Sequence, residues 1–219
     1  MKGAVIFDLD GVIVSTDNCH YEAWKRLADE EGIYFDEEIN QRLRGVSRMD
    51  SLEIILERAD RSYSEEEKKT LADRKNRYYR DLIQKLTPHD LLPGIKPILE
   101  GLKANGIKIA VGSSSKNTPL ILERLGLKDY FDAVADGNDL TKSKPDPQVF
   151  LLAAERLGVV PESCVVVEDA DAGVEAALAA GMQVVGVGTA AKNLRATLRA
   201  DTLATFTWKE LSRLVSGAD

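Results

Sequence analysis

The sequence has few of the residues that support disulfide-rich or metal-cluster proteins, with two cysteines and two histidines among 219 residues. Cys19 and Cys164 lie far apart, so neither a disulfide framework nor a zinc site is expected. Apolar runs of about 18 residues and a signal-peptide pattern are absent as well. The net charge is −7, which argues against nucleic acid or an anionic membrane surface as a partner. These absences predict a reduced, cytoplasmic protein that gathers positive charge locally if its ligand is anionic.

The remaining composition is that of an ordinary globular protein, with 44% hydrophobic and 30% charged residues. Beyond residue 90, short apolar segments typical of buried strands alternate with helical patterns, which predicts a doubly wound parallel sheet in an α/β fold. The expected strands are 107–111, 133–135, 164–167 and 184–187, and the expected helices are 118–125, 148–157 and 172–180.

A different pattern covers residues 15–87, where charged helical segments occur at 21–30, 51–58 and 65–86 without a convincing strand. We therefore expect an α/β core domain formed by 1–14 and 88–219, with a small all-helical cap domain inserted after the first strand. An insert at this point would cover the ends of the strands, where a lid belongs.

The first expected strand leads directly into two carboxylates, Asp8 and Asp10, followed by Gly11. In an extended chain, residues i and i+2 face the same side, so both carboxylates can address one reacting centre. This arrangement suits covalent phosphoryl transfer, in which one Asp attacks phosphorus and the other moves a proton. The alternative is an Asp-Gly turn that only closes the strand.

Further polar residues follow other expected strands. Ser113 comes after one apolar segment, and Glu168 and Asp169 come after another. In parallel sheets of this kind, ligands bind beyond the carboxyl ends of the strands. Asp8 and these three residues should therefore gather at one edge of the sheet.

Together with Lys144-Pro145, these segments resemble, in chain order, the haloacid dehalogenase superfamily of phosphoryl-transfer enzymes. The resemblance covers essentially the whole chain and implies Asp8 as nucleophile and Asp10 as general acid/base. It also implies a Mg²⁺ cofactor and two sets of binding residues. The metal ligands would be Asp8, the backbone carbonyl of Asp10, Glu168 and Asp169, and the phosphate-binding residues would be Ser113, Ser114 and Lys144. The structural alternatives are Ser113 as a helix cap, Lys144 as a solvated lysine, and Glu168-Asp169 as the first turn of a helix.

Within the superfamily, the segment from Arg44 to Ser51 is similar to the β-phosphoglucomutase branch. So are His20 with Trp24, Arg74-Lys75-Asn76 and Ser115-Lys116-Asn117. The resemblance implies that the phosphate not being transferred is bound by Arg48, Ser115, Lys116 and Asn117. It implies that His20, Arg44 and Lys75 contact the sugar or position Asp10. The full substrate-binding set expected from it is His20, Arg44, Gly45, Val46, Ser47, Arg48, Ser51, Lys75, Ser115, Lys116 and Asn117.

Alternatives remain for the residues of the insert. Arg44 and Arg48 can be solvated charges at a helix start, and His20 can be a polar residue on the solvent face of its helix. The sequence also departs from the branch pattern. Ser15 stands where Asp is common, Arg44 where Lys is usual, and Asp171 adds a third carboxylate after the acidic pair.

The branch implies interconversion of β-D-glucose 1-phosphate and D-glucose 6-phosphate by a monomer that acts on small sugar phosphates. A sugar-phosphate phosphatase on the same core is the enzymatic alternative, with water as the acceptor. A catalytically silent binding module is the third possibility, and the intact Asp8 and Asp10 argue against it. A disaccharide phosphate or another hexose phosphate would require a similar cap.

Overall fold

The computed structural model describes residues 3–43 and 47–216, and within it the chain forms two compact units. One unit combines Met1–Ser15 with Thr87–Asp219, and the other is Thr16–Leu86. We call them the sheet unit and the helical unit, and describe each by itself.

A six-stranded parallel sheet forms the centre of the sheet unit, with the strand order β3-β2-β1-β4-β5-β6. The chain runs outward from β1 in both directions, which confirms the predicted doubly wound α/β fold. Strands β1 and β4 are buried along their whole length, because helices cover both faces. The strands are β1 (Ala4–Phe7), β2 (Lys108–Gly112), β3 (Ala133–Ala135), β4 (Cys164–Glu168), β5 (Gln183–Gly186) and β6 (Leu198–Arg199).

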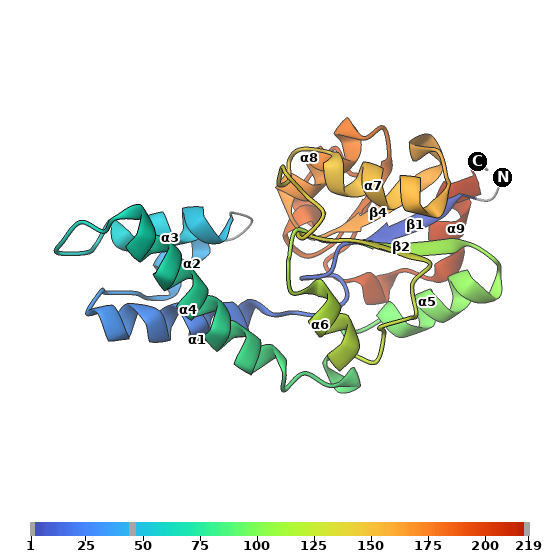
Figure 1. Ribbon diagram of the computed structural model, residues 1–219. Helices are drawn as coiled ribbons and strands as arrows, with labels where there is room; N and C mark the ends of the chain where they lie inside the picture. Colours follow the sequence, from blue (N-terminus) through green and yellow to red (C-terminus); the bar gives the residue numbers. More distant parts are fainter. Residues whose placement is uncertain (1–2, 44–46, 217–219) are drawn as a thin grey trace. The chain divides into compact units, whose positions relative to one another are not determined.

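Helices α7 (Gln148–Leu157) and α8 (Asp171–Ala179) cover one face of this sheet, and α5 (Ile95–Ala104) and α9 (Trp208–Ser216) cover the other (Figure 1). On the second face, Gly101 of α5 allows close packing, since a Cβ there would lie 2.2 Å from the Trp208 ring. The remaining helix of the unit is α6 (Thr118–Arg124), and short 3₁₀ turns occur at Pro88–Asp90, Pro161–Ser163, Gly188–Lys192 and Leu203–Thr205.

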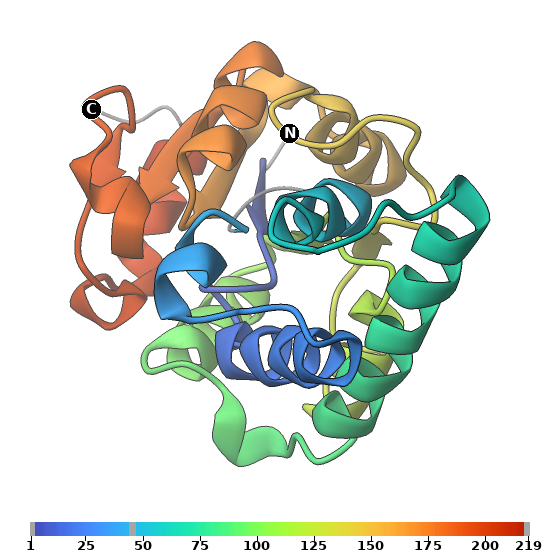
Figure 2. The ribbon, with the colours of Figure 1, turned by 90° about the vertical axis from the view of Figure 1, so that its left-hand side faces the viewer.

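The helical unit contains α1 (Asp17–Glu31), α2 (Glu37–Gln41), α3 (Arg48–Leu56) and α4 (Glu65–Ile83). Figure 2 shows its helices from a second direction, with α1 in blue and α4 in blue-green. Its apolar core is separate from that of the sheet unit and includes Trp24, Leu27, Leu52, Ile55 and Leu71. A second core gives this part of the chain its own reason to fold.

Local signals fix where the helices of this unit begin. Ser64 and Glu67 form a capping box at the start of α4, in which each side chain accepts from the other's backbone N–H, at 3.3 and 2.8 Å. Hydrogen bonds from Ser64 and Arg61 lower the pKa of Glu67 to about 2. At the start of α3, the Ser47 hydroxyl oxygen accepts from the backbone N–H of Asp50 at 3.2 Å.

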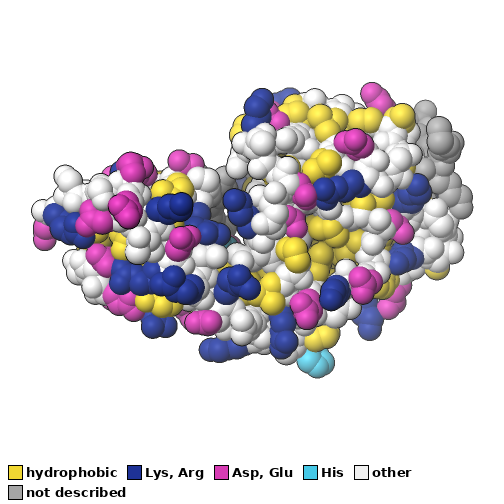
Figure 3. Space-filling model, in the orientation of Figure 1, with side chains coloured by type: hydrophobic (Ala, Val, Ile, Leu, Met, Phe, Trp, Pro, Cys, Tyr) yellow, Lys and Arg dark blue, Asp and Glu magenta, His cyan; other side chains and the backbone are white. Residues whose placement is uncertain are grey.

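Acidic and basic side chains are interspersed on the face of the helical unit seen in Figure 3. Within the helical unit, some charged side chains pair one helical turn apart, as Arg26 does with Glu30 at 3.1 Å and Lys68 with Glu65 at 3.0 Å. Surface ion pairs of this kind contribute little to stability, because water and salt screen them. Most of the charged side chains of α4 therefore form a solvated surface of the helix.

The elements differ from the sequence-based expectations mainly at their ends. Helix α1 begins at Asp17 rather than at residue 21, α3 begins at Arg48 rather than at 51, and α4 ends at Ile83 rather than at 86. The caps at Thr16 and Ser47 lie upstream of the apolar periodicity on which the predictions rested. The predictions did not include α2, α5, β6 and α9.

Among the residues that the structure describes, no helix is both long and apolar enough to cross a membrane.

Candidate active site

The register of the central strands sets three polar residues side by side. Phe7 of β1 pairs with Val111 of β2 and with Val167 of β4, and the Asp8 N–H donates to the Val167 carbonyl at 2.9 Å. Asp8 is thus level with Glu168, and Ser113 follows the end of the neighbouring strand β2. The sheet edge predicted from the sequence is the edge at which these residues occur.

Three carboxylates form a tight cluster at this edge. One oxygen each from Asp8, Glu168 and Asp169 lies within 4.8 Å of the others, and Asp8 and Glu168 are buried. Two glycines make room for them. A Cβ on Gly173 would lie 1.7 Å from Glu168 Oε1, and a Cβ on Gly11 would lie 2.1 Å from Asp169 Oδ2. The Glu168 and Asp169 carboxylates therefore occupy space that a larger residue at position 173 or 11 would take.

Lys144 is the cation within this cluster. Its ammonium group donates to Asp8 Oδ1 at 2.6 Å and to Glu168 Oε1 at 3.5 Å, and its side chain is only 10% exposed. The ammonium also lies 4.7 Å from the centre of the Phe150 ring. Burial alone would lower the pKa of Lys144, but the Asp8 and Glu168 carboxylates raise it. Lys144 is thus a fixed charge, and the alternative of a solvated lysine is excluded.

The cluster has the chemistry of a divalent-cation site. Glu168 Oε2 is buried and has no hydrogen-bond partner, which leaves a hard oxygen available to a cation. Burial, and then the charge of Asp8, raise the pKa of Glu168 well above its usual value. Carboxylates that share a buried place repel one another, and a bound cation would relieve that repulsion. A divalent cation fits this donor set, with Asp8, Glu168 and Asp169 as the side chains that would hold it.

The loop after β2 presents hydroxyl groups for an anion. The Ser113 oxygen accepts from the Ser115 N–H at 3.1 Å, and the Ser115 oxygen accepts from the Asn117 N–H at 3.2 Å. Because both oxygens act as acceptors here, the hydroxyl protons remain free to point at a phosphoryl group. The N-cap position of helix α6 (Thr118–Arg124) is Asn117, so Ser113 is not the cap of that helix. Ser114 and Lys116 are exposed on the same loop.

Asp10 belongs to a tight turn after β1. The Gly11 N–H donates to the Val14 carbonyl at 2.7 Å, and the Ile13 N–H donates to the Leu9 carbonyl at 2.9 Å. Gly11 has a φ of +78°, which favours glycine at this position. The Asp-Gly turn considered as an alternative is therefore real, and it occurs together with the carboxylate cluster rather than in its place.

In the helical unit, the buried Lys75 contacts the half-buried His20. The Lys75 ammonium lies 2.8 Å from His20 Nδ1 and over the rings of Trp24 and Tyr79, at 4.6 and 4.9 Å from their centres. An ammonium group can only donate, so Nδ1 accepts and the ring proton of a neutral His20 is on Nε2. Burial, and then Lys75 and Arg48, lower the pKa of His20. His20 is half-buried and packs against Tyr79 at 4.1 Å between ring centres, so part of its ring is covered by the unit itself.

Arg48 occupies the first turn of α3, directly after its cap Ser47. Its guanidinium is half-buried, which lowers its pKa, and Asp73 is the carboxylate that opposes this shift. Ser51 is buried one turn further along. Arg44, Gly45 and Val46 lie outside the described residues, so their assigned roles stay predictions.

In each unit, some residues that contact the predicted site residues were not singled out by the sequence analysis. Phe150 lies under the Lys144 ammonium, Tyr79 contacts both His20 and Lys75, and Gly173 makes room for Glu168. The sequence placed the two aromatic residues in expected helices but indicated no contact with a site residue. Asp171, the extra carboxylate, accepts from the Asn193 side chain at 2.9 Å and is not part of the three-carboxylate cluster.

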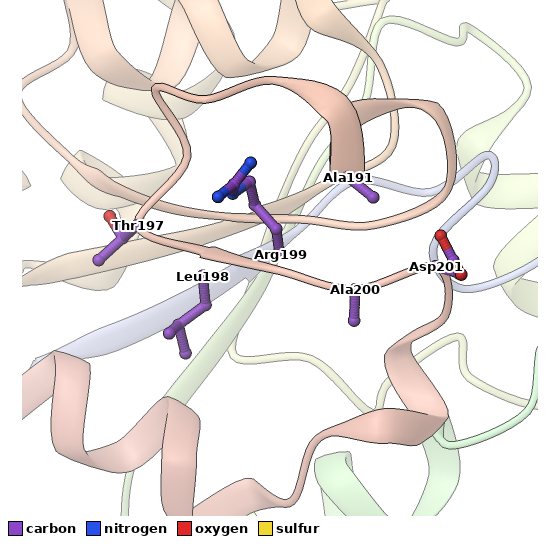
Figure 4. A pocket seen from close by; sticks show the side chains of 6 residues that line it. All are labelled: Ala191, Thr197, Leu198, Arg199, Ala200 and Asp201. Carbon is purple, nitrogen blue, oxygen red and sulfur yellow. The ribbon is translucent and has the colours of Figure 1, made fainter.

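A separate hollow of about 510 Å³ lies beside the edge strand β6 (Figure 4). It contains none of the residues assigned to the active site. Its lining residues are Ala191, Thr197, Leu198, Arg199, Ala200 and Asp201.

Comparison with known proteins agrees with this geometry. A family model described as haloacid dehalogenase-like hydrolase matches residues 2–181. The chain is 51% identical to β-phosphoglucomutase from Bacillus subtilis (strain 168) over 197 residues, which cover 89% of this chain and 87% of that protein. The chain belongs to the haloacid dehalogenase superfamily.

Two further relatives refine its place in the superfamily. The crystal structure of β-phosphoglucomutase from Clostridium difficile has a TM-score of 0.90 at 42% identity, covering 99% of this chain and 98% of that one. A phosphorylated-carbohydrates phosphatase from Thermotoga maritima is 37% identical over 92% of both chains. The predicted resemblance to the β-phosphoglucomutase branch of the haloacid dehalogenase superfamily is confirmed.

Gly173→Ala tests the space that glycine leaves for Glu168. Alanine is usually favoured over glycine in a helix by about 1 kcal/mol, so the helix itself should not suffer. The added methyl group must displace the Glu168 carboxylate, and we expect the affinity for Mn²⁺ to fall at least ~10-fold. Electron paramagnetic resonance of Mn²⁺ measures this directly.

Asp171→Asn is the matched control on the same helix. Asp171 is exposed and outside the cluster, so its charge is largely screened and the affinity should change by no more than about threefold. Equal losses in the two variants would show that Gly173 has no special relation to Glu168.

Proposed function

We propose that this chain interconverts β-D-glucose 1-phosphate and D-glucose 6-phosphate, with β-glucose 1,6-bisphosphate as the intermediate. The observation that carries the proposal is the 51% identity to the Bacillus subtilis β-phosphoglucomutase over nearly the whole chain. The arrangement of Asp8, Lys144 and the acidic pair supports phosphoryl transfer in general. Small sugar phosphates are then the partners, with no role for nucleic acid or a membrane.

Mg²⁺ is the cation that we assign to the carboxylate cluster, because it prefers hard oxygen ligands. Asp8, Glu168, Asp169 and the backbone carbonyl of Asp10 would hold it, and its charge would screen the phosphate from the anionic nucleophile.

In this mechanism, a carboxylate oxygen of Asp8 forms the new bond to phosphorus while the bond from phosphorus to the sugar oxygen breaks, and Asp10 gives its proton to that leaving oxygen. Lys144, which donates to Asp8 at 2.6 Å, also supplies positive charge for the incoming phosphoryl oxygens. The hydroxyl of Ser113 and the backbone N–H of Ser114 donate to those oxygens. The enzyme is then phosphorylated on Asp8.

Asp10 moves the proton in the second half of the reaction. A sugar hydroxyl attacks the phosphorus of phospho-Asp8, the bond from phosphorus to the Asp8 oxygen breaks, and Asp10 takes the hydroxyl proton. Release and rebinding of the bisphosphate in the opposite orientation brings its other phosphate to Asp8. The same steps in reverse then regenerate the phosphorylated enzyme.

The helical unit supplies the groups for the remaining phosphate and the sugar. Arg48 is the residue that we assign to the phosphate, since a planar guanidinium grips phosphate oxygens in two places. The Nε2–H of His20 is a fixed donor because Lys75 occupies the other ring nitrogen at 2.8 Å. On the sheet unit, Ser115, Lys116 and Asn117 complete the proposed phosphate contacts.

A sugar-phosphate phosphatase is the second candidate, and the 37% identity to the Thermotoga maritima phosphatase favours it. Both candidates form phospho-Asp8 and differ only in the acceptor, a sugar hydroxyl or water.

Asp10→Asn should lose the proton transfer but keep the cation, because the side chain is not one of the assigned ligands. We expect turnover to fall by ~10²–10⁴, as is typical for general acid/base catalysis, with little change in Mn²⁺ affinity. Coupled assays of glucose 6-phosphate formation measure the rate. A variant within about twofold of wild type would show that another group moves the proton.

Arg48→Ala should weaken mutase turnover much more than hydrolysis of a small acyl or aryl phosphate. Only a substrate with a remote phosphate can use Arg48 for alignment, so only that substrate loses its binding energy. Arg58→Ala is the matched control, an exposed arginine in the same unit. Equal losses on both substrates would assign Arg48 to the core machinery or to folding.

The fate of phospho-Asp8 distinguishes the two candidate functions. A mutase must be poorly set up to activate water until a sugar phosphate binds. We expect the phosphorylated enzyme to decay slowly in buffer and to be discharged at least ~10²-fold faster by glucose 6-phosphate. Phosphorus NMR should then find the phosphoryl group on the sugar.

Asp8→Asn, which cannot be labelled, is the control for that experiment. If inorganic phosphate is the main product and the sugar leaves the decay rate unchanged, the phosphatase is the correct assignment.

A further inference from the structure

Lys144 lies in the irregular segment between β3 and α7, yet its ammonium has to stay 2.6 Å from Asp8. Half of this segment is exposed, and no strand or helix fixes its backbone. Lysine side chains are flexible, so a charge held at one place needs other groups to restrain it. The groups that fix this segment therefore bear on the reaction.

A single side-chain oxygen holds the backbone before Lys144. Gln148 Oε1 accepts from the Thr141 N–H at 3.0 Å, from the Lys142 N–H at 2.9 Å and from the Thr141 hydroxyl at 3.3 Å. Gln148 is the first residue of α7, a helix packed on the sheet. The contact thus joins the irregular backbone at Thr141 and Lys142 to helix α7.

Two further contacts close the loop on itself. The Asp146 N–H donates to the Ser143 carbonyl at 3.0 Å, and the Gln148 N–H donates to Asp146 Oδ1 at 3.0 Å. Lys144 lies inside this closed arrangement, with its backbone fixed from both sides.

Helix α7 also contacts the Lys144 ammonium at the end of the side chain. Phe150, two residues after Gln148, is fully buried and lies 4.7 Å below the Lys144 ammonium. Its ring packs against Gly112, where a Cβ would lie 2.8 Å away. The first turn of α7 therefore restrains both the backbone that carries Lys144 and the charge at its tip.

We propose that Gln148 is a positioning residue for Lys144, acting through the three hydrogen bonds that its amide oxygen accepts. Gln148 does not touch the reacting atoms. It holds the segment 141–144 so that the lysine charge meets Asp8 without a search among rotamers. The role rests on the proposed phosphorylation of Asp8, since Lys144 acts there.

Three variants test this role. Gln148→Met keeps the size of the side chain but removes the acceptor, and Gln148→Glu keeps an acceptor in the same place. Glu210→Met is the matched control, because Glu210 Oε2 makes the same kind of contact at the start of α9, accepting from the Thr207 N–H at 2.8 Å and the Thr207 hydroxyl at 2.9 Å. Thermal melting by circular dichroism verifies that each variant is folded.

The rate of Asp8 phosphorylation by acetyl phosphate is measured in single turnover, which needs no sugar. We expect Gln148→Met to be at least ~10-fold slower, since small misplacements of a catalytic group have large effects on rate. Gln148→Glu should stay within about threefold of wild type, and Glu210→Met should match wild type. NMR supplies an activity-independent readout, with faster exchange of the Thr141 and Lys142 amides and loss of the slowly exchanging Lys144 ammonium signal in Gln148→Met alone.

The outcomes separate this role from the proposed function. If wild type is not labelled on Asp8, the proposed function fails, and the NMR signals still decide whether Gln148 fixes Lys144. Normal phosphorylation together with an unchanged ammonium signal in Gln148→Met would overturn the positioning role. Equal losses in the Met and Glu variants would overturn it as well.

Discussion

Repulsion among carboxylates held at one sheet edge is the constraint on which the site depends. Asp8, Glu168 and Asp169 approach within 4.8 Å in a largely buried place, where like charges cannot all stay ionised without compensation. Lys144 supplies part of the compensation through its contacts with Asp8 and Glu168. The uncompensated Glu168 oxygen marks the rest, which a divalent cation is suited to supply. The close approach of the three carboxylates thus accounts both for the suitability of the site for a cation and for the buried lysine beside the proposed nucleophile.

The helical unit solves the opposite problem, a buried positive charge. Lys75 is 2% exposed and is surrounded by the rings of Trp24 and Tyr79 and by a histidine nitrogen. The ring faces and the nitrogen lone pair stabilise the buried ammonium through cation–π and hydrogen-bond contacts.

The sequence alone predicts those features that depend on short-range patterns. The apolar run before Asp8 and the run before Glu168 marked two central strands, and the parallel topology followed from their alternation with helices. The parallel topology alone was enough to predict that Asp8 and Glu168 lie at the same end of the strands. Features set by tertiary contact were not predictable in this way. The edge strand β6 has two residues, too few for a periodic signal. Helix α9 does carry a helical pattern, with Trp208, Leu211 and Val215 three and four residues apart, and the sequence analysis missed it.

Side-chain acceptors and missing side chains were equally invisible. The sequence around Gln148 does not indicate that its side-chain oxygen accepts from two backbone amides. The sequence around Gly173 does not indicate that the Glu168 side chain lies against it. Both depend on which atoms the fold brings together. Arg48 and His20 were found only through resemblance, because a charge or an imidazole on a helix is compatible with many roles.

The chain enters and leaves the helical unit through two segments that are paired with each other in the sheet unit. Val14 bridges Leu91, and the Leu92 N–H donates to the Ile13 carbonyl at 2.9 Å. The ends of the insertion are therefore already joined, whatever the insertion contains. Lengthening or replacing the segment between them adds little loop-closure entropy and leaves the parallel strands intact. Substrate preference in such a design is free to diverge during evolution while the chemistry of the sheet edge is inherited unchanged.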